Sequence, residues 1–471
     1  MKGFRHLHII RSDCAEGHLI DSRRLTVNTR RILALVWGLL TIFSALEAYS
    51  QNSKQAYETM RLIRQEKMDL VLPGAMRDNN VDMWIHVVQS ANKDPLALDL
   101  GGWFEYRAWD PIGYYIFTDR GGDRIERIIL GGEDEEGLYD ISGSGNELLR
   151  LVAERDPRVI AVNMSTSLPI ANGLSHTAYL SMTDALGEEY TKRIVSAEKV
   201  ITDFRVRRVQ SEIVAFANAL EIQRQIMEAA LRRITPGITT PEEIGWWAAD
   251  QLLAQGIGPS YQAATLFLPY RPSGATNGVY QPGAFISWDM GIGYLNFGTD
   301  IKRNAYILRD GEEDLPEGLK LAWARGMTAR EILRKTFKAG RTAGESLEAI
   351  VAALEAADYV HTPSDDRTSQ YRDLVRALGD DKRSGFSIDF HATGNTSVGD
   401  ATAGPSVAAW RSATESIMVQ PNYIFALEFE LNTWVPEWNR RIGINFEDNA
   451  IVTNLGVEYL SPINEDIIII R

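Results

Sequence analysis

The spacing of hydrophobic positions changes along the chain and predicts two α/β regions. Over about residues 51–200, helical spacing alternates with short apolar runs, which favours a mixed sheet with helices on its faces. A long amphipathic helix is predicted over about 204–234, where apolar residues recur three or four positions apart and Pro236 and Gly237 end the pattern. Beyond it, a helix, helix, strand order occurs twice. We therefore expect an α/β (α+β) protein with an amino-terminal domain over 51–200 and a second domain over 201–471.

The stretch from Ala284 to Leu308 carries two aspartates, Asp289 and Asp300, at the ends of neighbouring β-like segments. Apolar, β-favouring runs flank a glycine-rich centre, which predicts a hairpin that brings the two carboxylates into one space. Carboxylates that are buried together repel each other, so such a pair marks either a cation site or a dyad that shares a proton. The alternative, from this stretch alone, is that both aspartates lie in turns or at a rim.

Three residues further along the chain extend this pair into a candidate set of metal ligands. His391, Glu430 and Glu447 each follow or close an apolar, β-like run. Four carboxylates and one imidazole suit a divalent ion such as Mn²⁺, Co²⁺ or Zn²⁺, and they are enough for two ions that share bridging carboxylates. Glu428 would face the same side of its strand as Glu430, so it either supports the site or is the true ligand of the two.

The order Asp, Asp, His, Glu, Glu, with its flanking residues, resembles a known family. The segments DMGIGYLNFGTDIKR, HATG, ELNTWVPEW and FEDNAIVT are similar to the metal-binding segments of the M24 metallopeptidases, the creatinase, Xaa-Pro aminopeptidase and prolidase group with the pita-bread fold. The segments VDMWIHVV, FTDRGGDRIERI and ANGLSHTAY resemble the amino-terminal creatinase-like domain of the same proteins. The resemblance covers about residues 60–460. It implies a creatinase-like α/β domain followed by a pita-bread metallopeptidase domain.

The resemblance also implies a role for each candidate residue. Asp289 would hold one ion, and Asp300 and Glu447 would bridge two divalent ions, with Mn²⁺ the first expectation and Co²⁺ or Zn²⁺ the others. His391 and Glu430 would hold the second ion, and Glu430 would take the proton of an activated water. The implied function is that of an exopeptidase, which removes an amino-terminal residue from proline-containing peptides.

Members of the family place further histidines around this site, and the corresponding segments of this chain contain none. Histidine is absent from residues 260–283 and from 395–404. Such groups stabilise the oxyanion, so we expect metal binding to be retained and peptide hydrolysis to be weaker. A catalytically impaired homologue that binds peptides or a protein partner is therefore the alternative function. His86, His176 and His361 match no metal-binding motif of the family, and we interpret them as structural or surface residues.

Composition and charge narrow the expected partners. A chain of 471 residues that is 45% hydrophobic and 24% charged is typical of globular proteins. A net charge of −14 argues against a nucleic-acid partner, because there is no basic field to neutralise phosphates. We expect a peptide substrate and, from the family resemblance, a homodimer.

Residues 1–50 have the pattern of a secretory signal. Arginines precede the apolar run Ile32–Phe43, and small residues including Ala48 precede the polar Gln51. The apolar run is short for a bilayer, so we expect a secreted or periplasmic protein without a stable membrane span after cleavage; an uncleaved signal anchor is the alternative. The only cysteine, Cys14, lies in this leader, which excludes a cysteine nucleophile and a thiolate metal site from the mature chain.

Overall fold

The structure is a computed structural model that describes most of the chain after residue 52. The described residues are 53–90, 92, 94, 96–101, 110–259, 274–295, 297–365, 368–394 and 404–471. The predicted leader with Cys14 lies outside them, as does most of the loop after His391, residues 395–403. Among the helices that the structure describes, none has both the length and the apolar character needed to cross a bilayer. Ala56–Arg471 form one compact unit, so the domain boundary near residue 200 stays a prediction.

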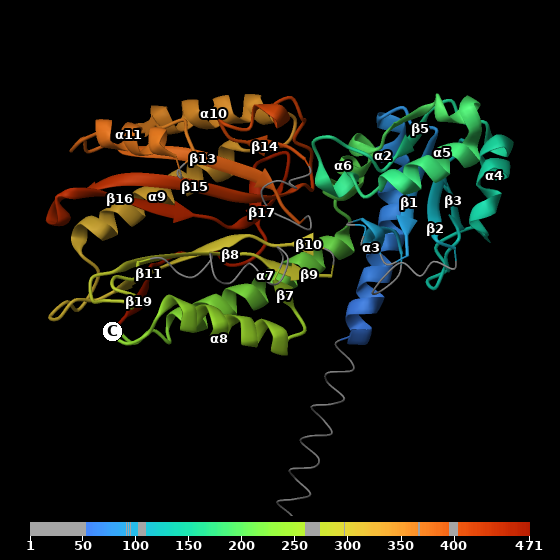
Figure 1. The fold of residues 1–471 in the computed structure, drawn as a ribbon. Helices are drawn as coiled ribbons and strands as arrows, with labels where there is room; N and C mark the ends of the chain where they lie inside the picture. Colours follow the sequence, from blue (N-terminus) through green and yellow to red (C-terminus); the bar gives the residue numbers. More distant parts are fainter. Residues whose placement is uncertain are drawn as a thin grey trace, which may run out of the picture. The chain divides into compact units, whose positions relative to one another are not determined.

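A six-stranded mixed sheet forms the amino-terminal part of this unit, with the strand order β4–β3–β2–β1–β5–β6 (Figure 1). The strands are β1 (Met83–Gln89), β2 (Ile112–Thr118), β3 (Glu126–Leu130), β4 (Ile141–Gly143), β5 (Ile160–Val162) and β6 (Ile194–Ser196). Strands β1, β2 and β3 are antiparallel, whereas β4, β5 and β6 each pair in parallel with a neighbour. This is the mixed sheet that the sequence predicts.

Helices cover both faces of that sheet. They are η1 (Lys67–Val71), α2 (Leu72–Asp78), α3 (Ala97–Leu100), α4 (Leu148–Arg155), α5 (His176–Thr191) and α6 (Glu198–Val206). Alternate residues of β1 point to opposite faces. Ile85 shares a hydrophobic cluster with Leu151 of α4 and Met182 of α5, whereas the ring of Trp84 lies 5.9 Å from that of Phe204 in α6. Burial on both faces explains the continuous apolar run of β1.

The long helix predicted over 204–234 is broken in the structure. Its first residues belong to α6, and a new helix, α7 (Gln210–Leu231), begins after an extended segment. Within that segment the Arg208 guanidinium pairs with Glu212 and donates a hydrogen bond to the Thr393 carbonyl at 2.7 Å. A continuous helix would carry Arg208 away from Thr393, two residues after His391, so a long-range contact overrides the local helical pattern.

In the rest of the unit, two further sheets meet along β11 and β16. A three-stranded sheet has the order β19–β11–β8, and a larger one has the order β12–β13–β15–β17–β18, with β14 paired to β13 and β16 paired to β15. The strands are β8 (Phe285–Met290), β11 (Ile301–Ile307), β12 (Tyr359–His361), β13 (Ser384–Ala392), β14 (Ser406–Val407), β15 (Ile424–Val435), β16 (Arg440–Phe446), β17 (Asn449–Val452), β18 (Val457–Tyr459) and β19 (Ile468–Ile470). A small third sheet joins β7 (Gly258–Pro259), β9 (Ile292–Tyr294) and β10 (Phe297–Gly298).

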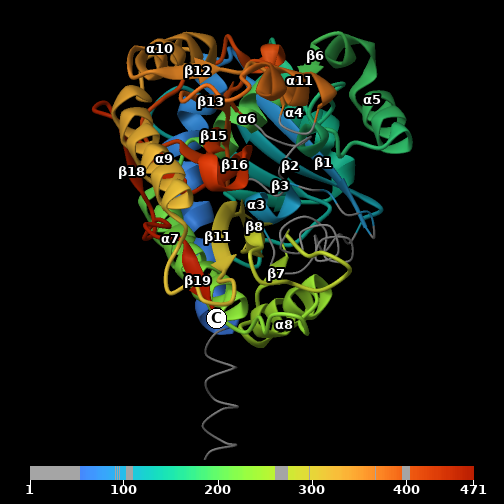
Figure 2. The ribbon, with the colours of Figure 1, turned by 90° about the vertical axis from the view of Figure 1, so that its left-hand side faces the viewer.

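Helices pack on the outer sides of the two larger sheets. They are α7, α9 (Glu317–Thr336), α10 (Ala343–Ala356) and α11 (Ser369–Ala377), whereas α8 (Pro241–Ala254) packs on α7 and β7. Helix α7 lies against β11 and β19, and α9 lies against β15 and β16 (Figure 1 and Figure 2). The sheets are joined between these helices by a backbone hydrogen bond from the Lys302 N–H to the Glu447 carbonyl at 3.0 Å. This junction holds the candidate site.

A glycine in α9 allows the helix to approach the strand that leads to Glu447. A Cβ added at Gly326 would lie 2.0 Å from Cζ of Phe446, whose ring stacks on Phe429 with a centroid separation of 4.9 Å. Gly326→Ala should therefore lower the free energy of unfolding by about 1–3 kcal/mol, despite the better helix propensity of alanine. Urea unfolding followed by tryptophan fluorescence would measure this change.

Gly344→Ala in α10 is the matched control. A Cβ there would meet nothing closer than 3.4 Å, so we expect no loss of stability. If both variants unfold at the wild-type urea concentration, the side chain of Phe446 does not pack against Gly326 as closely as described.

Candidate metal centre

The two aspartates of the central hairpin enter the site from β8 and the start of β11. Strands β8 and β11 are antiparallel, as predicted, and Lys302 pairs with Asp289 in the register. Asp300 lies just before β11 and is 4% exposed. Successive side chains of a strand point to opposite faces, so Lys302 lies on the same side as Asp300.

The remaining residues come from the larger sheet. His391 lies near the end of β13, and Glu428 lies on β15 opposite Asp389. Glu447 follows the last residue of β16 and is 1% exposed. The backbone hydrogen bond between β11 and Glu447 brings this carboxylate to the hairpin.

Three of the predicted ligands converge on one point. Nε2 of His391 lies 3.7 Å from Oδ2 of Asp300 and 3.8 Å from Oε1 of Glu447. One ligand atom from each of the three residues lies within 4.8 Å of the other two. Ligand atoms about 2.0–2.2 Å from a shared ion lie up to about 4.4 Å apart, so these atoms come close to the geometry of a single divalent ion.

The hydrogen-bonding state of Glu447 and His391 also suits a bound ion. Oε1 of Glu447 is buried and has no hydrogen-bond partner among the described residues, although a buried carboxylate oxygen ordinarily has one. Nδ1 of His391 faces the carbonyl of Ala392 at 3.4 Å, and a proton on Nδ1 leaves the Nε2 lone pair directed toward Asp300 and Glu447. Asp300, His391 and Glu447 would therefore hold the ion.

Glu428, and not Glu430, is the β15 carboxylate beside these residues. Its Oε2 lies 4.0 Å from Nε2 of His391. Glu430 is two residues further along the strand, about 6–7 Å away, where its Oε1 accepts a hydrogen bond from Nδ2 of Asn432 at 3.0 Å. The sequence interpretation chose Glu430 and kept Glu428 as the alternative; in the structure, Glu428 is the one of the two that lies beside His391.

Lys302 is the residue of the site that the sequence analysis missed. Its Nζ lies 3.3 Å from Oδ2 of Asp289 and 2.9 Å from Oε2 of Glu447, and it also pairs with Oε1 of Glu428. The signal was present in the segment TDIKR, because a residue two positions after Asp300 on a strand shares its face. Lys302 therefore brings a positive charge of the chain itself into the carboxylate cluster.

Burial and the close carboxylates shift the ionisation of the whole cluster. Burial raises the pKa of Asp300 and of Glu447 well above the usual values, and neighbouring carboxylates raise both further. Burial also raises the pKa of Glu428 to about 7. Burial alone would lower the pKa of Lys302, but the surrounding carboxylates raise it well above its usual value. Burial lowers the pKa of His391 to about 4, so the imidazole is neutral at pH 7, as a metal ligand must be.

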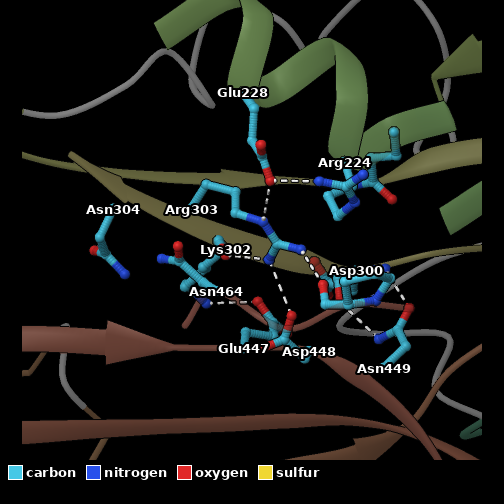
Figure 3. Close-up of polar contacts among 12 residues, drawn as sticks. Arg224, Glu228, Asp300, Lys302, Arg303, Asn304, Glu447, Asp448, Asn449 and Asn464 are labelled. Atoms are coloured by element: carbon cyan, nitrogen blue, oxygen red, sulfur yellow. Dashed lines mark hydrogen bonds and ion pairs between the residues drawn. The ribbon is translucent and has the colours of Figure 1, made fainter. Parts of the chain in front are cut away.

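The two buried residues that follow Glu447 in the chain, Asp448 and Asn449, hold the site in place. The side-chain amide of Asn449 accepts a hydrogen bond from the Asp300 N–H at 3.0 Å and donates one to the Asp300 carbonyl at 2.6 Å, as Figure 3 shows. Asp448 accepts a hydrogen bond from Nη1 of Arg303 at 2.9 Å. Asn449 thus fixes the backbone of Asp300 and leaves the carboxylate of Asp300 to face His391.

The other histidines that the structure describes lie away from this site. His86 is fully buried in β1 and its Nε2 lies 2.8 Å from Oδ1 of Asp94, which agrees with the structural role we assigned to it. His361 on β12 stacks on Phe386 with a centroid separation of 5.0 Å. His176 is the first residue of α5. Among the described residues, His391 is thus the histidine that reaches the carboxylate cluster.

Comparisons with known proteins agree with the family resemblance. Residues 215–454 match the model of metallopeptidase family M24. The fold is similar to that of the X-Pro aminopeptidase from Thermotoga maritima, with 15% identity, a TM-score of 0.56, and coverage of 84% of this chain and 100% of that one. The fold is also similar to that of the Xaa-Pro dipeptidase from Bacillus anthracis, with 16% identity, a TM-score of 0.53, and coverage of 87% of this chain and 99% of that one. Aminopeptidase P from E. coli with the inhibitor Pro-Leu is similar as well, with 14% identity, a TM-score of 0.51, and coverage of 86% of this chain and 94% of that one. None of the curated sequences matches this chain significantly.

Proposed function

Because the chain belongs to metallopeptidase family M24, we propose that it is a metal-dependent exopeptidase that removes the amino-terminal residue from peptides with proline in second position. The observation that carries this proposal is the convergence of Asp300, His391 and Glu447, with one buried oxygen of Glu447 left without a hydrogen-bond partner among the described residues. A divalent ion held there, with Mn²⁺ as the first expectation, would supply Lewis-acid chemistry to a peptide carbonyl. The Xaa-Pro preference rests on similarity to the relatives named above.

The residues of the chain have separate tasks in this proposal. His391, neutral and fixed by Ala392, offers Nε2 to the ion. Glu428 takes the proton role that the family resemblance gave to Glu430, because its Oε2 lies at the cluster and Glu430 does not. A general base can take a proton from water and return it to the leaving amine when its pKa is near the working pH. Asp289, whose side chain is 36% exposed, lies at the open side of the cluster.

A peptidase assay with and without metal tests the proposal. Protein treated with a chelator should not cleave Ala-Pro-Ala, and added Mn²⁺ should restore the release of alanine, measured by chromatography. Ala-Ala-Ala is the matched control substrate and should be cleaved more slowly. Turnover should be slow, because the family's additional histidines are missing from 260–283 and 395–404.

A second candidate function is favoured by one observation. Lys302 pairs with carboxylates of the cluster and offsets part of their repulsion without any ion. A protein with such a cluster could bind peptides without hydrolysing them. Calorimetric binding of Ala-Pro-Ala to the Mn²⁺-loaded protein, with no alanine released, would favour this binding protein and reject the exopeptidase.

A further inference from the structure

The Lys302 ammonium contacts three carboxylates of the cluster, two of them through hydrogen bonds. A lysine ammonium has three N–H donors and no acceptor. Nζ of Lys302 contacts carboxylates from three separate segments, Asp289 on β8, Glu428 on β15 and Glu447 after β16. A cation that collects carboxylates from separate parts of the fold occupies the kind of position that a metal ion fills in an acidic centre.

Glu447 lies between this ammonium and the candidate ion position. Its Oε2 lies 2.9 Å from Nζ of Lys302. Its other oxygen, Oε1, lies 3.8 Å from Nε2 of His391 and has no hydrogen-bond partner among the described residues. One carboxylate therefore faces two cation positions, of which the chain itself supplies one.

The backbone and its surroundings hold Lys302 in this position. Its N–H donates to the Glu447 carbonyl at 3.0 Å, and its carbonyl accepts a hydrogen bond from Nη1 of Arg303 at 2.8 Å. The residue is 6% exposed, and it pairs with Asp289 in the β8–β11 register. Moving the ammonium aside would break all three carboxylate contacts and leave a charge in a buried place.

The charges of the cluster oppose a second dication. The ammonium and two divalent ions would carry more positive charge than the four carboxylates Asp289, Asp300, Glu428 and Glu447 can neutralise. A second ion shared by Asp289, Glu428 and Glu447 would also need the space that Nζ of Lys302 fills. The two-ion centre implied by the family resemblance does not fit these residues.

We propose that the Lys302 ammonium takes the place of one of the two metal ions, so that the centre binds a single divalent ion through Asp300, His391 and Glu447. This inference rests on the proposed function only for the existence of an ion site, and it does not require hydrolysis. It identifies Lys302 as a fixed cation that neutralises the acidic centre, and it makes Glu447 the bridge between that cation and the ion.

Metal stoichiometry tests the proposal directly. The chelator-treated full chain is saturated with Mn²⁺, desalted, and analysed for metal and protein, with calorimetric titration as a second measure. The wild type should bind one Mn²⁺ per chain, and Lys302→Ala should bind two, because the variant opens a position lined by three carboxylates. Lys335→Ala, which removes an exposed lysine of α9, is the matched control and should bind one.

Electron paramagnetic resonance keeps the test valid if Lys302→Ala does not fold. Wild-type protein with Mn²⁺ should give the six-line spectrum of isolated ions, whereas two ions in contact give a spin-coupled spectrum. Two Mn²⁺ per wild-type chain, a coupled spectrum, no bound Mn²⁺, or a folded Lys302→Ala variant that still binds one would each overturn the inference.

The outcomes separate this inference from the proposed function. One bound ion without cleavage of Ala-Pro-Ala rejects the exopeptidase and retains the role of Lys302. Two bound ions with cleavage retain the exopeptidase and reject the role of Lys302.

Discussion

Asp448→Ala is expected to lower the free energy of unfolding by about 3–5 kcal/mol, the cost of removing one partner from a buried ion pair. Asp448 is 1% exposed and accepts hydrogen bonds from Arg303 at 2.9 Å and from Arg330 at 2.8 Å. The variant would leave two guanidinium groups in the interior without this carboxylate. Arg303 has a second acidic side chain near it, at 4.0 Å, in Glu228 of α7 (Figure 3).

Urea unfolding measured by circular dichroism would test this loss. The matched control is Asp373→Ala, which removes the acidic partner of Arg376 in an exposed pair at 2.7 Å on α11. Exposed pairs contribute little, so the control should unfold close to the wild-type urea concentration. If both variants lost the same free energy of unfolding, the buried ion pairs of Asp448 would contribute no more to stability than the exposed pair of Asp373.

Glu428→Gln should lower kcat/KM for Ala-Pro-Ala by about 10²–10⁴-fold, the usual effect of losing a general acid–base group. Glu430→Gln should change it by no more than a few-fold. The two substitutions are chemically identical and lie two residues apart on one face of β15, but only Glu428 lies beside His391 and pairs with Lys302, whereas Glu430 accepts a hydrogen bond from Asn432.

Steady-state kinetics with Mn²⁺ would measure both variants. The Mn²⁺ affinity of each, measured by calorimetry, separates a lost proton transfer from a lost ion. A larger loss in Glu430→Gln than in Glu428→Gln would restore the original interpretation of the sequence and reject the site described above.

Much of the fold was predictable because it depends on local patterns. The two α/β regions and the hairpin from Ala284 to Leu308 follow from hydrophobic spacing and glycine placement, and the M24 assignment follows from the motifs around Asp289 and His391. The break between α6 and α7 was not predictable, because the contact between Arg208 and Thr393 joins residues 185 positions apart. Local propensity cannot anticipate a partner that distant.

The choice between Glu428 and Glu430 shows a second limit. Strand alternation places both on one face, so a period of two residues cannot separate them. What separates them is the register of β15 on β13, which sets Glu428 opposite Asp389 and Glu430 opposite Ser387. That register comes from long-range pairing and is not a property of either strand alone.

Lys302 was missed for a different reason. Carboxylates and an imidazole were the only residue types taken as candidates for the site, and no basic residue was counted among them. The same alternation that grouped the acidic residues would have placed Lys302 beside Asp300, two positions away. A basic residue at i+2 from a predicted metal aspartate therefore deserves the same consideration as the acidic residues.

The covalent attachment of the Lys302 ammonium to the chain has a consequence for the supply of cations. An ion from solution can be stripped by a chelator, diluted away or exchanged for a competing metal, whereas a side-chain ammonium remains with every copy of the protein. The centre therefore keeps one positive charge beside Asp289 and Glu447 even where free manganese is scarce. When the metal is scarce, the carboxylates that contact Lys302 would stay in place, and the ion site would remain able to bind an ion.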